Sequence, residues 1–323
     1  MIETSILDPI QNLPLVIEPD ASSLKAVSGD ALAAWYIENR NLVEGYLHKH
    51  GAILFRGFAI DTPSAFARFT RSVLVSLLDY VDGNSPRTKL TAGVYTSTEY
   101  PPEYFISLHN ELSYSTVWPS KLVFCCITAP NQGGETPIAD CRTILEKLDP
   151  AIVDQFTRKQ VKYQRHLHSG SGFGPSWQAT FETEDRSVVE GYCIKRSIDF
   201  EWRKDGTLKL TQIRPGVATH PVTGEKVWFN QADQFHPATQ PEEVSKSLTA
   251  LFKLREDELP QNASFGDGSP INSAMLKQIQ RTVLDNAVVF AWQQGDFLLV
   301  DNMLVCHGRM PFAGPRKILV AMA

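Results

Sequence analysis

The sequence predicts a mainly β protein with flanking helices, built on a β-barrel or jelly-roll core. Three observations support this fold class. Short apolar runs bounded by glycine, proline and asparagine recur along the chain, and such runs are typical of strands. Segments with helical spacing are few and interrupt these runs. The length of 323 residues is enough for a large core, so we expect a single domain over residues 1–323.

The strand-like segments begin only after an N-terminal lead-in. The first 25 residues contain three prolines and are expected to be irregular. The segments that predict strands are short, apolar and rich in β-branched or aromatic residues. They are residues 51–58, 105–114, 121–129, 161–168, 208–216, 226–230, 287–292, 296–302 and 317–323.

Three segments carry helix signals. Thr62 can cap a helix that has Pro63 at its first position, and Phe66, Phe69, Val73 and Leu77 follow at helical spacing. A second helix is expected to start at Pro241 and to carry Val244, Leu248 and Leu251. A third is expected to start at Pro270 and to carry Met275, Ile279 and Val283. We expect these helices to pack outside the strands.

Composition narrows the classes of partner. Hydrophobic residues make up 43% of the chain and charged residues 21%, and the formal net charge is −5. No strong positive field exists to attract nucleic acid, and no run of 18 apolar residues exists to span a membrane. The N-terminus has acidic residues and prolines where a signal peptide has basic and then apolar ones. We therefore expect a cytoplasmic protein with a small-molecule partner, and self-association stays open.

The five cysteines predict free thiols. Their number is odd and no CxxC motif occurs. Cys125 and Cys126 are adjacent in an apolar run, so on a strand they point to opposite faces. We expect buried, reduced cysteines.

A metal site is predicted by the segment LHNEL. His109 and Glu111 stand two residues apart, so on an extended chain both side chains leave the same face. His307, after the apolar run 296–302, is the candidate third ligand. Two imidazoles and one carboxylate form the facial triad of non-haem Fe(II) oxygenases and leave three coordination sites open.

Two further residues fit a dicarboxylic cosubstrate. Thr136 ends the segment GGET after the metal strand, and Arg316 follows His307 in GRMPFAGPRKIL. A carboxylate distant from the metal needs an arginine fork and a hydroxyl donor, and Thr136 and Arg316 can supply them. Arg309, two residues after His307, is the alternative to Arg316 for this role or reaches the substrate instead.

With these motifs in order, the chain resembles the taurine dioxygenase/clavaminate synthase-like superfamily of Fe(II), 2-oxoglutarate oxygenases. The resemblance runs from about Gly51 to the end of the chain. It rests on GAILFRGF, LHNELSYS, PNQGGET, VWFNQ and DNMLVCHGRMPFAGPRKIL. The fold that it implies is a double-stranded β-helix, a distorted jelly roll.

The resemblance also implies roles for individual residues. His109, Glu111 and His307 would bind Fe(II), while Arg316 and Thr136 would bind 2-oxoglutarate, with O2 as the second cosubstrate. Glutamate as the acidic ligand is similar to the clavaminate synthase, asparagine oxygenase and syringomycin-type aspartate hydroxylase side of the superfamily. Those relatives act on amino acids, free or tethered to a peptidyl carrier protein. A carboxylate ligand also disfavours halogenation, because it fills the metal site that chloride needs.

The implied reaction is hydroxylation of an unactivated C–H bond of such a substrate, in specialised (natural-product) metabolism such as antibiotic biosynthesis. Candidate substrate residues are Arg309, Asn230 and Gln231, whereas His220 and His236 stand beside prolines and are not expected to be ligands. Two alternatives remain. The same iron site can support desaturation or cyclisation, or the chain can be a catalytically silent regulator on this fold.

Overall fold

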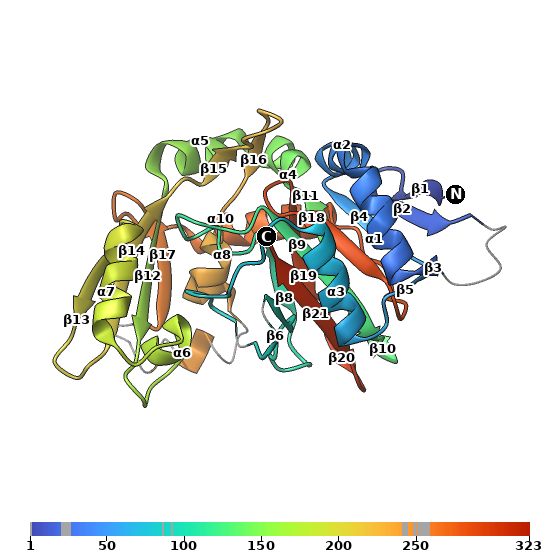
Figure 1. Ribbon diagram of the computed structural model, residues 1–323. Helices are drawn as coiled ribbons and strands as arrows, with labels where there is room; N and C mark the ends of the chain where they lie inside the picture. Colours follow the sequence, from blue (N-terminus) through green and yellow to red (C-terminus); the bar gives the residue numbers. More distant parts are fainter. Residues whose placement is uncertain are drawn as a thin grey trace.

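The computed structural model describes residues 2–20, 27–85, 87–91, 93–240, 245–247, 250 and 259–323. Its largest element is a sheet of eight strands, in the order β1-β2-β4-β18-β9-β21-β7-β6 (Figure 1). The strands are β1 (Ile2–Asp8), β2 (Leu13–Pro19), β4 (Ala52–Phe55), β6 (Lys89–Thr91), β7 (Val94–Thr96), β9 (Lys121–Thr128), β18 (Phe297–Asp301) and β21 (Lys317–Met322). All neighbours pair antiparallel except β2 and β4, which are parallel.

A second sheet carries the motif residues. It has the order β11-β19-β8, from β8 (Ile106–His109), β11 (Ile138–Asp140) and β19 (Val305–Arg309). Side chains of this sheet share one apolar cluster with one face of the large sheet, and Leu108, Ile138 and Val305 meet Leu54 and Leu298 in it. The two sheets therefore enclose a common core, as in a jelly roll.

The other face of the large sheet is covered by helices. Alternate residues of the same strands, such as Ile53 and Leu299, pack there, as expected when side chains alternate between faces. The covering helices are α1 (Gly29–Glu38), α2 (Arg40–His50) and α3 (Pro63–Val73). The predicted cap is present, since Thr62 Oγ1 accepts from the Ala65 N–H at 3.2 Å. Figure 1 shows α1 and α2 in the blue N-terminal part and α3, in a lighter blue, nearer the centre of the view.

A four-stranded sheet extends from the core on the other side (Figure 1). Its order is β13-β14-β12-β17, and its apolar residues pack with α6 and α7 in a cluster of their own. The bounds here are β12 (Val161–Leu167), α6 (Trp177–Phe181), α7 (Arg186–Lys195), β13 (Asp199–Trp202), β14 (Leu208–Arg214) and β17 (Gln261–Phe265).

The remaining elements connect these layers. They are β3 (Val27–Ser28), β5 (Phe58–Ala59), β10 (Gln132–Gly133), α4 (Cys141–Lys147), α5 (Pro150–Lys159), β15 (Val217–Thr219), β16 (Lys226–Trp228), α8 (Ala232–Phe235), η1 (Pro237–Thr239), α10 (Ser273–Asp285) and β20 (Phe312–Ala313). All five cysteines are free and buried, as predicted. Within the described ranges, no helix combines the length and apolar character needed to cross a membrane.

Two expectations about elements are wrong, and a third lies outside the described residues. The N-terminal lead-in is not irregular, because β1 and β2 form there. Pro14 and Pro19 lie near the two ends of β2, where missing N–H donors are tolerated. Residues 287–292 form no strand, and Val288 makes only an isolated bridge to Ile138. The helix expected from Pro241 lies outside the described residues at Val244, Leu248 and Leu251.

Candidate functional site

A cavity of about 890 Å³ contains most of the predicted site residues. His109, Glu111, Thr136, His307, Arg309 and Arg316 all line it, and so does Gln231. Asn230 does not line it. The size is that of a small-molecule site.

The two histidines face each other across a strand pair. β8 and β19 are antiparallel, with His109 and His307 as direct partners, and their ring centroids are 4.5 Å apart. Gly308 permits this close pairing, because a Cβ at that position would lie 2.5 Å from the Ile106 carbonyl oxygen. The glycine of the His-Gly motif is therefore needed for backbone approach.

Glu111 joins the histidines from a turn. β8 ends at His109, so the expectation that an extended chain carries both ligands is wrong for Glu111. Asn302 holds the turn instead. Its Oδ1 accepts from the Glu111 N–H at 2.8 Å, and its Nδ2 donates to the Glu111 and Pro119 carbonyls at 2.9 Å each. Asn302 is fully buried, so this clamp is shielded from water.

The three side chains form a cluster suited to a metal ion. One ligand atom from each of His109, Glu111 and His307 lies within 4.8 Å of the others. Burial lowers the pKa of His109 and lowers that of His307 well below its ordinary value. Both rings are therefore neutral at neutral pH, which is the form that binds metal. His307 Nδ1 is buried and has no hydrogen-bond partner among the described residues, so the donor set fits Fe(II).

The orientation of His109 is fixed by a chain of amides. Its Nδ1 lies 2.9 Å from the Ser107 carbonyl oxygen, so Nδ1 is the donor and Nε2 is left for a metal. The same oxygen accepts from Gln234 Nε2 at 3.0 Å, and Gln234 Oε1 accepts from Gln231 Nε2 at 2.7 Å. Gln231 Oε1 in turn accepts from Ser113. Gln231 is thus linked to the His109 ring through Gln234 and the Ser107 carbonyl of β8.

The carboxylate of Glu111 has two buried neighbours. Arg87 Nη2 contacts its Oε2 at 2.5 Å, and the Tyr80 hydroxyl donates to its Oε1 at 3.3 Å. The Arg87 guanidinium also lies over the Tyr80 ring, 4.2 Å from its centroid. An isolated carboxylate at this depth would be costly, and Arg87 compensates its charge.

Thr136 and Arg316 lie at the cavity wall beside the histidines. β10 and β20 pair antiparallel and bring the GGET segment next to Arg316, whose Nε donates to the Gly134 carbonyl at 2.9 Å. Neither terminal nitrogen of Arg316 has a hydrogen-bond partner among the described residues. Burial, and then the charge of Arg309, lower the pKa of Arg316 to about 10. Thr136 Oγ1 accepts from Trp292 Nε1 at 3.1 Å, so its own hydroxyl proton can be donated.

Arg309 is committed to the backbone. Its Nη1 donates to the Tyr100 carbonyl at 2.7 Å, and its Nη2 donates to the Pro101 and Tyr104 carbonyls at 2.5 and 2.8 Å. These contacts pin the segment 100–104 over β19. Asn230 is likewise engaged, with Nδ2 on the Gly216 carbonyl at 2.8 Å and Oδ1 accepting from the Ala232 N–H at 3.1 Å. The substrate roles of Arg309, Asn230 and Gln231 stay predictions.

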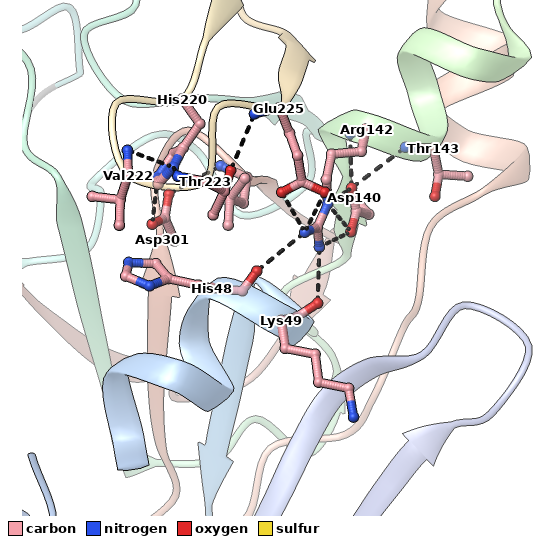
Figure 2. A network of polar contacts seen from close by, with 11 residues as sticks. His48, Lys49, Asp140, Arg142, Thr143, His220, Val222, Thr223, Glu225 and Asp301 are labelled. Atoms are coloured by element: carbon pink, nitrogen blue, oxygen red, sulfur yellow. Dashed lines mark hydrogen bonds and ion pairs between the residues drawn. The ribbon is translucent and has the colours of Figure 1, made fainter. Parts of the chain in front are cut away.

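A polar network behind the sheet supports the turn that carries Asn302 (Figure 2). His220 Nε2 lies 3.1 Å from Asp301 Oδ2, while Asp301 Oδ1 accepts from the Met303 and Leu304 N–H groups at 3.0 Å each. In the same network Arg142 joins Asp140 and Glu225 to the end of α2. His220 is not part of the cluster of His109, Glu111 and His307.

Several residues of the site were not predicted from the sequence, among them Asn302, Trp292, Arg87, Asp233, Tyr80 and Gln234. Asn302 and Trp292 act on Glu111 and Thr136, and Arg87 and Asp233 line the cavity directly. The DN pair before the distal histidine is a turn signal that could have indicated Asn302. Arg87 stands in a loop with no motif around it, so no local signal identifies it.

Comparisons with known proteins agree with this geometry. The family model described as taurine catabolism dioxygenase TauD, TfdA family, matches residues 16–322. The dapdiamide synthesis protein DdaC of Enterobacter agglomerans is 38% identical over 304 residues, covering 94% of this chain and 91% of the relative. A clavaminate synthase-like protein of Arabidopsis thaliana is 31% identical over 322 residues, covering 96% and 93%.

Solved structures add the fold. PvcB, an Fe, alpha-ketoglutarate dependent oxygenase from an isonitrile synthetic pathway, superposes with a TM-score of 0.56 at 17% identity, covering 99% of this chain and 91% of PvcB. AAD-2 in complex with Mn(II) and N-oxalylglycine superposes with a TM-score of 0.55 at 15% identity, covering 100% and 97%. The expected double-stranded β-helix is confirmed.

Proposed function

The chain belongs to the TauD/TfdA family of dioxygenases, and from this premise we propose that His109, Glu111 and His307 hold its Fe(II). The family makes the protein a non-haem Fe(II), 2-oxoglutarate-dependent oxygenase that uses O2. The observation that carries the ligand assignment is the buried cluster of two neutral imidazoles and one carboxylate inside the cavity. Such a set leaves three coordination sites for cosubstrate and dioxygen.

We assign the far carboxylate of 2-oxoglutarate to Arg316 and Thr136. Arg316 supports the assignment because it is partly buried, charged and free at both terminal nitrogens within the described chain. Arg309 fits less well, because both of its terminal nitrogens already donate to carbonyls of residues 100–104. A carboxylate bound at Arg316 would offset the desolvation of a partly buried cation that otherwise has no counter-ion among the described residues.

The protein's own contribution is orientation and exclusion of water. When bound, Fe(II) and 2-oxoglutarate would supply the electrons that activate dioxygen, which is the oxidant, and 2-oxoglutarate would become succinate and CO2. Asn302 fixes the Glu111 turn, and the Gln234–Ser107 contact fixes the His109 ring. Arg309 holds the segment 100–104 against β19. These contacts would hold the ligand side chains and the cavity wall in a fixed arrangement around a bound substrate.

The substrate class that we propose is an amino-acid-like small molecule, free or bound to a peptidyl carrier protein. DdaC is named for dapdiamide synthesis, which supports a place in specialised metabolism. The cavity is lined by amides, hydroxyls and charges as well as apolar groups, and these suit a polar headgroup. Hydroxylation is the proposed outcome.

The test is anaerobic loading with Fe(II) and 2-oxoglutarate, admission of O2, and a substrate screen read by mass spectrometry. Succinate should form, and its yield should couple to a product that is heavier by one oxygen. A product that is lighter by two hydrogens would replace hydroxylation by desaturation or cyclisation. No succinate with any substrate, from protein that binds Fe(II), would contradict catalysis and favour a silent regulator.

A further inference from the structure

Asp233 is an enclosed carboxylate that belongs neither to the proposed metal site nor to the proposed cosubstrate site. It stands on α8 and lines the cavity beside the candidate metal cluster. Its hydrogen-bond partners among the described residues are all neutral: Gln280 Nε2 donates to Oδ2 at 3.3 Å, and Ser107 and the backbone N–H groups of residues 233 and 234 also hydrogen-bond to the carboxylate. Within the described ranges, no arginine, lysine or histidine lies at ion-pair distance from it. The carboxylate therefore faces the cavity with no counter-ion.

The arginines that line the cavity each have another partner or an assigned role. Arg87 pairs with Glu111, and Arg165 pairs with Asp82. Arg309 donates to carbonyls, and Arg316 is assigned to the cosubstrate.

Among the acidic residues that line the cavity, Glu111 is paired and Glu103 is exposed to solvent. Asp233 alone of these described acids is both enclosed and unpaired. Desolvation raises its pKa to about 6 although neutral donors hydrogen-bond to it, so it is mostly ionised at neutral pH, and no cation of the described residues offsets its charge.

We propose that Asp233 binds a positively charged nitrogen of the substrate, so that a free ammonium group is required for tight binding. The inference rests on the proposed function and deepens it. A carboxylate without a cation favours an ammonium over a neutral amide, because only a charged partner offsets its desolvation. A second metal ion is disfavoured, since among the described residues Asp233 joins no metal-binding group of three.

The position of Asp233 places this nitrogen near the metal cluster. The next residue, Gln234, donates to the Ser107 carbonyl that also receives His109 Nδ1. A cation at Asp233 therefore lies on the β8 side of the cluster. Arg316 holds the opposite charge elsewhere on the same wall, so the ammonium and the cosubstrate carboxylate occupy separate places.

The first experiment uses fragments, because the substrate is unidentified. Protein loaded with Mn(II) and 2-oxoglutarate under argon is titrated by calorimetry with ethylammonium and with ethanol at constant ionic strength. The wild type should prefer ethylammonium at least tenfold, and Asp233→Asn should lose that preference while its melting temperature shows a folded protein. Glu103→Gln is the matched control, since it makes the same chemical change at an exposed position and should keep the preference.

Three results would overturn the inference. These are no preference in the wild type, an unchanged preference in Asp233→Asn, or an equal loss in Glu103→Gln, which would indicate only the general electrostatic field of the cavity.

A second experiment uses turnover. Amino acids and their N-formyl derivatives are offered in pairs, and coupled succinate is measured. Asp233→Asn should raise KM for the amines at least thirtyfold with a smaller change in kcat.

The two proposals fail separately in the turnover experiment. If the wild type forms no succinate at all, the oxygenase activity itself fails. If succinate forms but N-formyl derivatives couple as well as the amines, or if Asp233→Asn keeps the wild-type KM, the assignment of Asp233 fails and the oxygenase stands.

Discussion

Replacing Arg316 by glutamine should weaken 2-oxoglutarate binding without weakening the fold. The side chain is partly buried, its Nε donates to the Gly134 carbonyl, and its two terminal nitrogens have no partner among the described residues. Two charge-assisted hydrogen bonds to a carboxylate contribute roughly 1.5–3 kcal/mol each. Their loss, about 3–6 kcal/mol in total, raises the Kd for 2-oxoglutarate by roughly 10²- to 10⁴-fold.

The same variant should leave the unliganded protein as stable as the wild type, or more stable. A buried cation without a counter-ion is a cost that glutamine removes, and the lowered pKa of Arg316 reflects that cost. Arg309→Gln is the matched comparison. It should destabilise the fold, because three carbonyls of residues 100–104 lose their donor, and it should change 2-oxoglutarate binding less.

The assay is calorimetric titration of 2-oxoglutarate into Mn(II)-loaded protein, together with urea unfolding of the metal-free protein. The reasoning would be refuted if Arg316→Gln retained the wild-type Kd while Arg309→Gln lost binding. That pattern would move the cosubstrate role to Arg309.

Three further predictions concern stability and metal affinity. Asp233 has a pKa of about 6 in the folded protein against roughly 3.9 in the unfolded chain, so the destabilisation by its burial is absent below about pH 4 and complete above about pH 6. Between these limits, the stability of Asp233→Asn relative to the wild type should rise by on the order of 2–3 kcal/mol in urea unfolding. A difference that does not depend on pH would contradict this. Asn302→Ala removes two hydrogen bonds to Glu111 and one to the Pro119 carbonyl and should lower Mn(II) affinity by roughly 10- to 100-fold, whereas an unchanged affinity would mean that the Glu111 turn keeps its conformation without Asn302. Arg142→Met removes the ion pairs with Asp140 and Glu225 in the network of Figure 2. Because the side chain is 18% exposed, the free energy of unfolding in urea should fall by only about 2 kcal/mol. A fall in Mn(II) affinity as large as that of Asn302→Ala would contradict a purely structural role.

The clustering of His109, Glu111 and His307 could be predicted because these positions are local in sequence or tied to a motif. The spacing of His109 and Glu111 and the glycine after His307 are visible in the chain itself. The reason offered for Glu111 was nevertheless wrong. The strand ends at His109, and Glu111 reaches the cluster through a turn that Asn302 holds from 191 residues away. Such a long-range clamp leaves no periodic trace in a single sequence.

The misplaced elements have a similar cause. Residues 287–292 have the composition of a strand, yet only Val288 finds a strand partner, since pairing depends on tertiary neighbours and not on propensity. The prolines of the N-terminus suggested irregular chain, yet they lie near the two ends of β2. The contacts of Arg309 depend on the loop 100–104 folding over β19, which spacing cannot reveal.

The most direct test of the central claim is the absorption band of the anaerobic Fe(II)·2-oxoglutarate complex, measured in the wild type and in three variants. We expect the wild type to show the band with one Fe(II) bound per chain. His109→Ala and His307→Ala should remain folded but lose both the band and turnover. His48→Ala, outside the cavity, should keep both. Retention of the band and full activity in His307→Ala would contradict the assignment of His109, Glu111 and His307 as the iron ligands.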